Sequence, residues 1–113
     1  MTARLPAHLE VAGLIRAVEA AGGFATVVHK GEREAGTILL ILTKKGADSR
    51  LFERMPSLDG KRSWHCTMKQ DIDNKSQFED YVSRRAAGDP DLWIVELDIV
   101  DGERLIGSAD ITG

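Results

Sequence analysis

The feature that most constrains this chain is a run of five apolar residues, Ile38 to Leu42, inside a predicted strand from Ala35 to Thr43. Successive side chains of a strand point to opposite faces of a sheet, so this strand is apolar on both faces. A strand of this kind lies in the middle of a sheet that is covered on both sides. The sequence therefore predicts a sheet whose second face must be covered by the C-terminal segment or by a partner.

Length and composition are those of one small globular domain. The 113 residues leave room for a single hydrophobic core, so we expect one domain over residues 1–113. Apolar residues make up 42% of the chain and charged residues 29%, which is unlike a disordered protein. A net charge of -3 argues against a general binder of polyanions.

Cysteine content and hydropathy bear on the cellular compartment. Cys66 is the only cysteine, so the chain forms no internal disulfide, and a reducing compartment fits. The first residues lack the continuous apolar segment of a signal peptide. The longest apolar run is too short to span a bilayer. We therefore expect a cytoplasmic protein without a membrane partner.

Helical periodicity predicts two helices. The first runs from Pro6 to Ala21 and ends at the Gly22-Gly23 pair, because glycine adopts the positive φ of a helix end without strain. The second runs from Lys75 to Ala87, with Asn74 as its N-cap. The apolar stripe of the first helix consists of Val11, Leu14, Ile15 and Val18.

Four consecutive strands are predicted between the two helices. A two-residue turn at Gly31-Glu32 joins a strand from Phe24 to Lys30 to the two-faced strand. A third strand, from Arg50 to Met55, continues through Asp59-Gly60, the strongest hairpin signal in the chain, into a fourth. These strands predict an antiparallel meander.

The C-terminal part adds a fifth strand, from Leu92 to Ile99. Residues 100–113 are weakly patterned and predict a loosely ordered tail or a short helix from Glu103 to Ser108. The predicted fold class is α+β, an open antiparallel sheet of about five strands with two helices. The predicted order is helix, four strands, helix, strand, with both helices on one face of the sheet.

The Asp59-Gly60 turn also predicts a register. Counting outward pairs Met55 with Trp64, which places Trp64 and Cys66 on the core face and His65 on the wet face. The other predicted pairs are Arg54 with His65, Glu53 with Cys66 and Leu51 with Met68. Cys66 is therefore expected to be a small buried residue, and a Cys–His nucleophilic pair cannot form within this hairpin.

Two carboxylates, Glu96 and Asp98, lie two residues apart on one face of the last strand. They could act as an acid–base pair in a cleft with His29 and Arg54, but a solvated strand end is the simpler and favoured interpretation. The residues predicted to contact a ligand or partner are His29, Lys30, Arg33, Arg54, Glu96 and Asp98. No catalytic residue, metal site or cofactor is assigned.

Basic residues gather at the predicted hairpin ends, where they could contact phosphates. The pairs are Lys30 with Arg33, Lys44 with Lys45, and Lys61 with Arg62. The first pair alternates with Glu32 and Glu34, and the strand faces lack an aromatic platform for stacking bases. Nucleic-acid binding is thus the weakest of the candidate functions.

Several short segments, taken together, resemble one known family. They are Ala21-Gly22-Gly23-Phe24-Ala25, Lys30-Gly31-Glu32, Ala35-Gly36, Gly46-Ala47-Asp48 and Asp89-Pro90-Asp91-Leu92-Trp93 with Glu96. In order and spacing, from Arg4 to about Arg104, the chain resembles the short alphaproteobacterial proteins called domain of unknown function 1491. The resemblance implies a bacterial, cytoplasmic protein without an assigned activity, and it supplies no catalytic residues.

The leading hypothesis is a small non-catalytic interaction module that acts as a homodimer or within a larger assembly. It rests on the two-faced strand, because two helices on one side of the sheet leave the other side bare. One alternative is a small enzyme with a carboxylate and histidine cleft. The other is a nucleic-acid binder that uses its hairpin tips.

Overall fold

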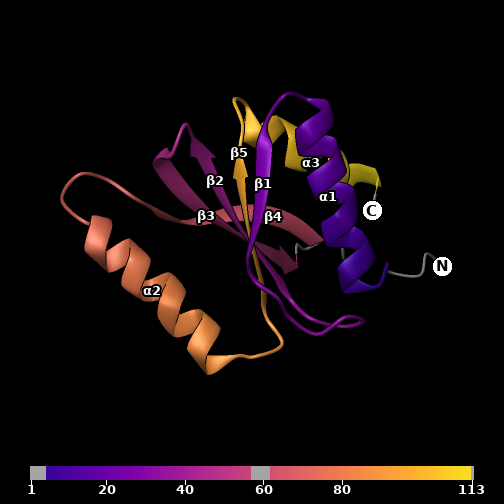
Figure 1. Ribbon diagram of the computed structural model, residues 1–113, viewed down its shortest axis with the longest axis horizontal. Coiled ribbons are helices and arrows are strands. Elements are labelled where there is room, and N and C mark those ends of the chain that lie inside the picture. Colours follow the sequence, from indigo (N-terminus) through magenta and orange to yellow (C-terminus); the bar gives the residue numbers. More distant parts are fainter. Residues whose placement is uncertain (1–4, 57–61, 113) are drawn as a thin grey trace.

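A five-stranded sheet forms the centre of the molecule, with helices on both of its faces (Figure 1). The computed structural model describes residues 5–56 and 62–112. The strands are β1 (Phe24–His29), β2 (Ile38–Lys44), β3 (Ala47–Pro56), β4 (Arg62–Lys69) and β5 (Trp93–Asp98). The helices are α1 (Ala7–Ala20), α2 (Lys75–Gly88) and α3 (Gly102–Thr112). The predicted class, an open α+β fold with about five strands, is confirmed.

The strand order is β1-β5-β2-β3-β4, so β5 lies between β1 and β2. It is antiparallel to β1 and parallel to β2, and the sheet is therefore mixed rather than purely antiparallel. The predicted pairing of the first two strands is wrong. Residues from Leu92 to Val95 are all buried, so β5 is covered on both faces and occupies the middle of the sheet, as β2 does.

The residues predicted to turn at Gly31-Glu32 instead form a loop that packs on the start of β5. The backbone N–H of Glu32 donates to the carbonyl of Asp91 at 3.0 Å, and that of Trp93 donates to Thr37 at 2.8 Å. The indole Nε1 of Trp93 donates to the carbonyl of Glu32 at 2.7 Å. Because of this loop, β1 and β2 do not pair with each other, and β5 lies between them.

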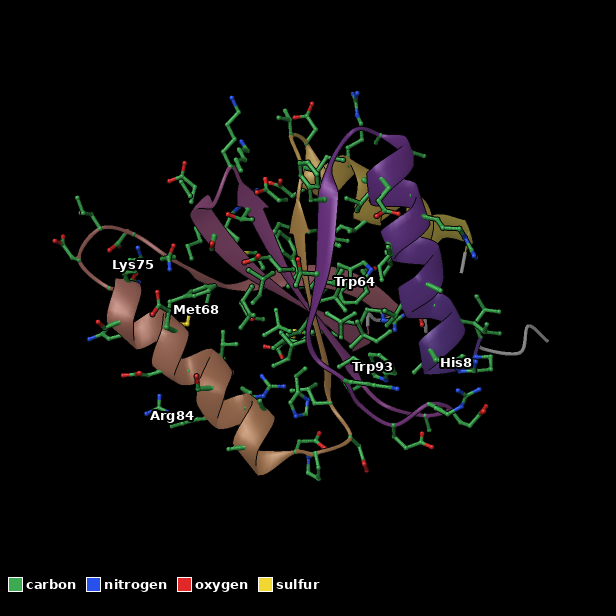
Figure 2. All side chains as sticks on the ribbon, in the orientation of Figure 1. His8, Trp64, Met68, Lys75, Arg84 and Trp93 are labelled. Atoms are coloured by element: carbon green, nitrogen blue, oxygen red, sulfur yellow. The ribbon has the colours of Figure 1, made fainter. Side chains whose placement is uncertain are left out.

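Two separate cores cover the two faces of the sheet. Helices α1 and α3 pack on one face, where Val11, Leu14 and Val18 meet alternate residues of β2 and β5. Helix α2 packs on the other face, where Phe78 meets Leu39 and Ile94. Figure 2 shows Trp64 and Trp93 on the α1 side of the sheet and Met68 on the α2 side.

The prediction that both helices share one face is therefore wrong. The apolar stripe of α2 covers the second face of β2, whose residues Ile38 to Thr43 are all buried. No partner is needed to cover this strand. The two-faced strand therefore gives no reason to expect self-association.

The pairing of β3 with β4 differs by one residue from the predicted register over most of its length. Leu51 pairs with Met68 as predicted, but a bulge follows, and Arg54 then pairs with Trp64. The two other shifted pairs are Glu53 with His65 and Phe52 with Cys66. The Asp59-Gly60 turn lies outside the described residues.

Cys66 was expected in the core, but its side chain is exposed. It lies on β4, the outermost strand on this side of the sheet. Trp64, the other residue expected on the core face, is partly buried against the core of α1 and α3. Trp93 of β5 is 5% exposed. The hairpin therefore partly buries its tryptophan and leaves its thiol exposed.

The C-terminal segment forms helix α3, which is longer than the predicted short helix. Ile106 is buried against the sheet, and Gly102 approaches Leu42 of β2. Within the part of the chain that the structure describes, no helix is both long and apolar enough to cross a membrane.

Candidate functional site

Three of the residues predicted to contact a ligand lie at the end of β1 and in the loop after it. His29 Nδ1 donates to the carbonyl oxygen of Leu92 at 2.5 Å, which ties β1 to the residue before β5. Arg33 Nη2 donates to Nε2 of His8 at 3.3 Å, and Lys30 is exposed. His29 and Arg33 thus hold neighbouring segments together, whereas Lys30 extends into solvent.

Arg54 lies on the α1 side of the sheet. Its guanidinium forms a two-pronged ion pair with Glu10 of α1, with Nη2 at 3.0 Å from Oε1. The same group lies over the Trp64 ring, 4.7 Å from the ring centre. Arg54 therefore links β3 to α1, and its charge already has a partner.

Glu96 and Asp98 lie on the opposite side of the sheet from Arg54. Alternation along β5 places them with Ile94, which packs in the core under α2. Asp98 Oδ1 accepts a hydrogen bond from the backbone N–H of Lys45 at 2.7 Å. The sheet separates Arg54 from these two carboxylates, so the four residues of the predicted cleft do not share one concavity.

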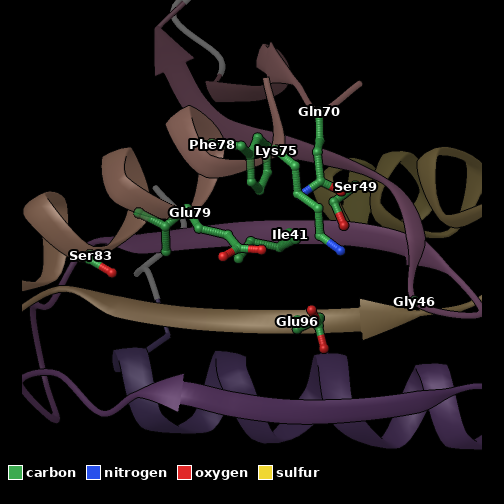
Figure 3. A pocket seen from close by; sticks show the side chains of 10 residues that line it. Ile41, Gly46, Ser49, Gln70, Lys75, Phe78, Glu79, Ser83 and Glu96 are labelled. Carbon is green, nitrogen blue, oxygen red and sulfur yellow. The ribbon is translucent and has the colours of Figure 1, made fainter. Parts of the chain in front are cut away.

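Glu96 lines a pocket between α2 and the sheet (Figure 3). The pocket has a volume of about 400 Å³. Its walls come from three parts of the chain: Ile41, Gly46 and Ser49; Gln70, Lys75, Phe78, Glu79, Val82 and Ser83; and Glu96. The sequence pattern missed Lys75 and Glu79, although their spacing of four residues beside Phe78 places all three on neighbouring positions of one helix face.

The second exposed feature is the outer edge of β1. Among the described strands, β1 pairs only with β5, so its other edge has no strand beside it. Phe24 is 75% exposed, Val28 is 52% exposed and Val27 is 40% exposed. Figure 1 looks toward this edge, with α1 on one side of the strand and α2 on the other. We call these three side chains and the strand edge the β1 edge.

The β1 edge was missed because the predicted hairpin placed this strand beside β2. A signal was available, since no residue from Phe24 to Val28 is charged and three are large and apolar. Basic pairs, by contrast, lie at opposite ends of the sheet, with Lys30 and Arg33 beyond β1 and Lys44 and Lys45 at the β2–β3 turn. Lys61 lies outside the described residues. Within the described chain, no three side chains are grouped as metal ligands would be.

The fold and these surfaces define a small open-sheet α+β protein with one uncharged edge strand. The chain belongs to the family described as protein of unknown function (DUF1491), whose model matches residues 5–107. The family resemblance expected from the sequence is thus confirmed over nearly the whole chain.

Several solved structures share the fold, and two of them are of DUF1491 family proteins. A crystal structure of a DUF1491 family protein from Caulobacter crescentus CB15 is 34% identical, with a TM-score of 0.77, covering 90% of this chain and 94% of that one. An NMR structure from the same organism is 33% identical, with a TM-score of 0.75 and coverages of 93% and 94%. Protein Atu0922 from A. tumefaciens is 26% identical, with the same TM-score and coverages. No curated protein matches the chain.

Proposed function

We propose that the protein is a small non-catalytic interaction module that acts in the cytoplasm as a homodimer joined through the β1 edge. In this arrangement the β1 strands of two copies lie antiparallel and continue one sheet across both molecules. The observation that carries the proposal is the uncharged edge strand with exposed Phe24, Val27 and Val28.

An edge strand presents a row of backbone N–H and C=O groups that can pair with another strand. Monomeric proteins discourage this pairing with lysine, proline or inward charges on the edge. The segment from Phe24 to Val28 carries none of these residues. The bulge at Val28, where the register with β5 shifts, is a feature that discourages edge pairing, but it leaves Phe24 to Val27 in regular register with β5.

A second copy of the chain suits this edge for reasons of charge and symmetry. Two β1 strands bring no like charges together, because the strand itself is uncharged from Phe24 to Val28. An antiparallel strand pair is compatible with a twofold axis, which closes the contact so that it does not extend into a fibre. The exposed apolar side chains of both copies would then lose water together.

The non-catalytic part of the proposal is supported by the placement of the predicted cleft residues. Arg54 is paired with Glu10, and it lies across the sheet from Glu96 and Asp98. His29 is tied to the Leu92 carbonyl. Proton transfer needs groups in contact or joined by one water, which this separation does not offer.

Size-exclusion chromatography with light scattering tests the proposal. At about 100 μM, well above the micromolar dissociation constant of a modest interface, the protein should elute with the mass of a dimer. Val28→Lys should give a monomer, because a lysine in the strand would place two like charges in the contact.

The matched control is Ile72→Lys, which also replaces an exposed apolar residue by lysine. Ile72 is 94% exposed in the segment between β4 and α2, far along the chain from the β1 edge. This variant should keep the dimer mass. A monomeric wild-type protein at this concentration, or an unchanged dimer in Val28→Lys, would rule out the proposed interface.

A further inference from the structure

The pocket beside α2 has an apolar floor and a charged rim. Phe78 is 3% exposed and Ile41 is 6% exposed, and together they form the floor between helix and sheet. Lys75 and Glu79 come from α2, and Glu96 comes from β5 on the other side (Figure 3). Small-molecule sites usually combine an apolar lining with a few convergent polar groups in this way.

The charges at the rim do not neutralise one another directly. Figure 3 shows the Lys75 side chain extending over the floor toward β5, on which Glu96 lies. Even so, the ion pairs of the described residues join Arg50 to Glu103, Arg54 to Glu10 and Arg85 to Glu53, and none involves Lys75 or Glu96. A cation and an anion on opposite walls therefore leave a gap that a ligand with both charges would fill.

The start of α2 adds positive partial charge at the Lys75 end of the pocket. Asn74 precedes the helix, but its side chain makes no capping hydrogen bond to the first turn. Its amide instead accepts from the N–H of Asp71 at 2.6 Å and donates to the Lys69 carbonyl at 3.0 Å. Uncapped N–H groups at a helix start favour a negative group nearby. Asp71 Oδ1 already accepts from the N–H groups of Asp73 and Asn74 just before the helix, so the positive end of the pocket consists of Lys75 and the N–H groups of the first turn alone. Glu96 supplies the negative end.

We propose that this pocket binds a free amino acid with an apolar side chain. The ligand's carboxylate lies at Lys75 and the first turn of α2, and its ammonium group lies at Glu96. Its side chain rests on Phe78 and Ile41, and Glu79 adds a second carboxylate that disfavours a purely anionic ligand. The volume of about 400 Å³ is enough for a molecule of this size. This site is independent of the proposed self-association.

Three ligands that share one branched alkyl body separate the contributions of the two charges. They are L-leucine, isoamylamine, which lacks the carboxylate, and isocaproate, which lacks the ammonium group. Each is titrated to about 10 mM, above the millimolar range in which weak ligands bind, into isotope-labelled protein observed by NMR. L-leucine should shift the backbone amides of Ile41, Phe78 and Glu96, and the other two ligands should bind at least tenfold more weakly.

Two variants locate the charge contact. Glu96→Gln keeps the shape of the side chain but removes its charge, and it should weaken L-leucine binding at least tenfold. Glu19→Gln makes the same change at an exposed position of α1 and should leave binding unchanged. The proposal is overturned if L-leucine causes no shifts at the pocket, if isoamylamine or isocaproate binds as well as L-leucine, or if Glu96→Gln binds like the wild type.

Discussion

At the scale of single residues, the ion pairs differ in how far their side chains are exposed to solvent. The Arg54 side chain is 14% exposed and its partner Glu10 is 24% exposed. The Arg50 side chain is 18% exposed, but its partner Glu103 is 50% exposed. The hydrogen bond from Arg50 holds the pKa of the Glu103 carboxyl below its usual value. Both pairs form, yet solvent screens the second far more than the first.

Replacing Glu10 by alanine should therefore destabilise the protein strongly. Arg54 would keep its charge beside the Trp64 ring without a counterion, and breaking a largely buried pair costs about 3 kcal/mol. Glu103→Ala should cost at most about 1 kcal/mol, because that carboxylate is half exposed. Urea unfolding measures both values, and equal losses in the two variants would show that Arg54 is not held as described.

At the scale of elements, the β1–β2 loop and the start of β5 form one packed unit. A Cβ atom built on Gly36 would lie 2.4 Å from the carbonyl oxygen of Asp91, and one on Gly31 would lie 2.2 Å from it. Three of the segments that carry the family resemblance, Lys30-Gly31-Glu32, Ala35-Gly36 and Asp89 to Trp93, thus meet in space. Their shared role is close backbone packing, which leaves the gap that β5 occupies.

Gly36→Ala should cost about 1–3 kcal/mol of stability, since the added methyl group can be accommodated only if backbone moves. Gly13→Ala provides the contrast, because Gly13 lies within α1 and has no neighbour within 4 Å of its built Cβ. That variant should gain about 0.5–1 kcal/mol from the better helix propensity of alanine. Chemical unfolding distinguishes the two, and a stable Gly36→Ala protein would contradict the packed loop.

Local patterns in the sequence predicted most helices and strands well. They did not predict which distant segments contact one another. The stripe of Val11, Leu14 and Val18 gave α1 to within a residue at each end, and the apolar run of β2 correctly indicated a strand covered on both faces. The position of β5 depends on the loop contacts of Glu32 and Trp93, which no local pattern reveals.

The candidate site was likewise predicted where it depends on local pattern and missed where it depends on contacts between distant segments. Glu96 was correctly placed on one face of the last strand, but its neighbours Lys75 and Phe78 come from a helix whose side of the sheet was predicted wrongly. Arg54 was grouped with Glu96 because sequence alone does not show that the sheet separates them. The uncharged sequence of β1 hints at its exposure, but its place at the edge follows from its pairing with β5, a contact between distant segments.

At the scale of the whole molecule, the surface that lacks cover is an edge and not a face. Helices α1 and α3 cover one face of the central strands, and α2 covers the other. The exposed apolar residues of β1 lie beyond this cover. The proposed dimer would pair the backbone groups of this edge and remove Phe24, Val27 and Val28 from water.

Hydrogen exchange of the β1 segment, followed by mass spectrometry, tests the proposed dimer most directly. Backbone N–H groups that face away from β5 exchange readily in a monomer but are protected when a second β1 strand pairs with them. Raising the protein concentration from about 1 μM to about 100 μM should therefore slow exchange in residues 24–29 and leave β4, the other edge strand, unchanged. Equal exchange of residues 24–29 at both concentrations, in a protein whose mass stays that of a monomer, would contradict the proposed dimer.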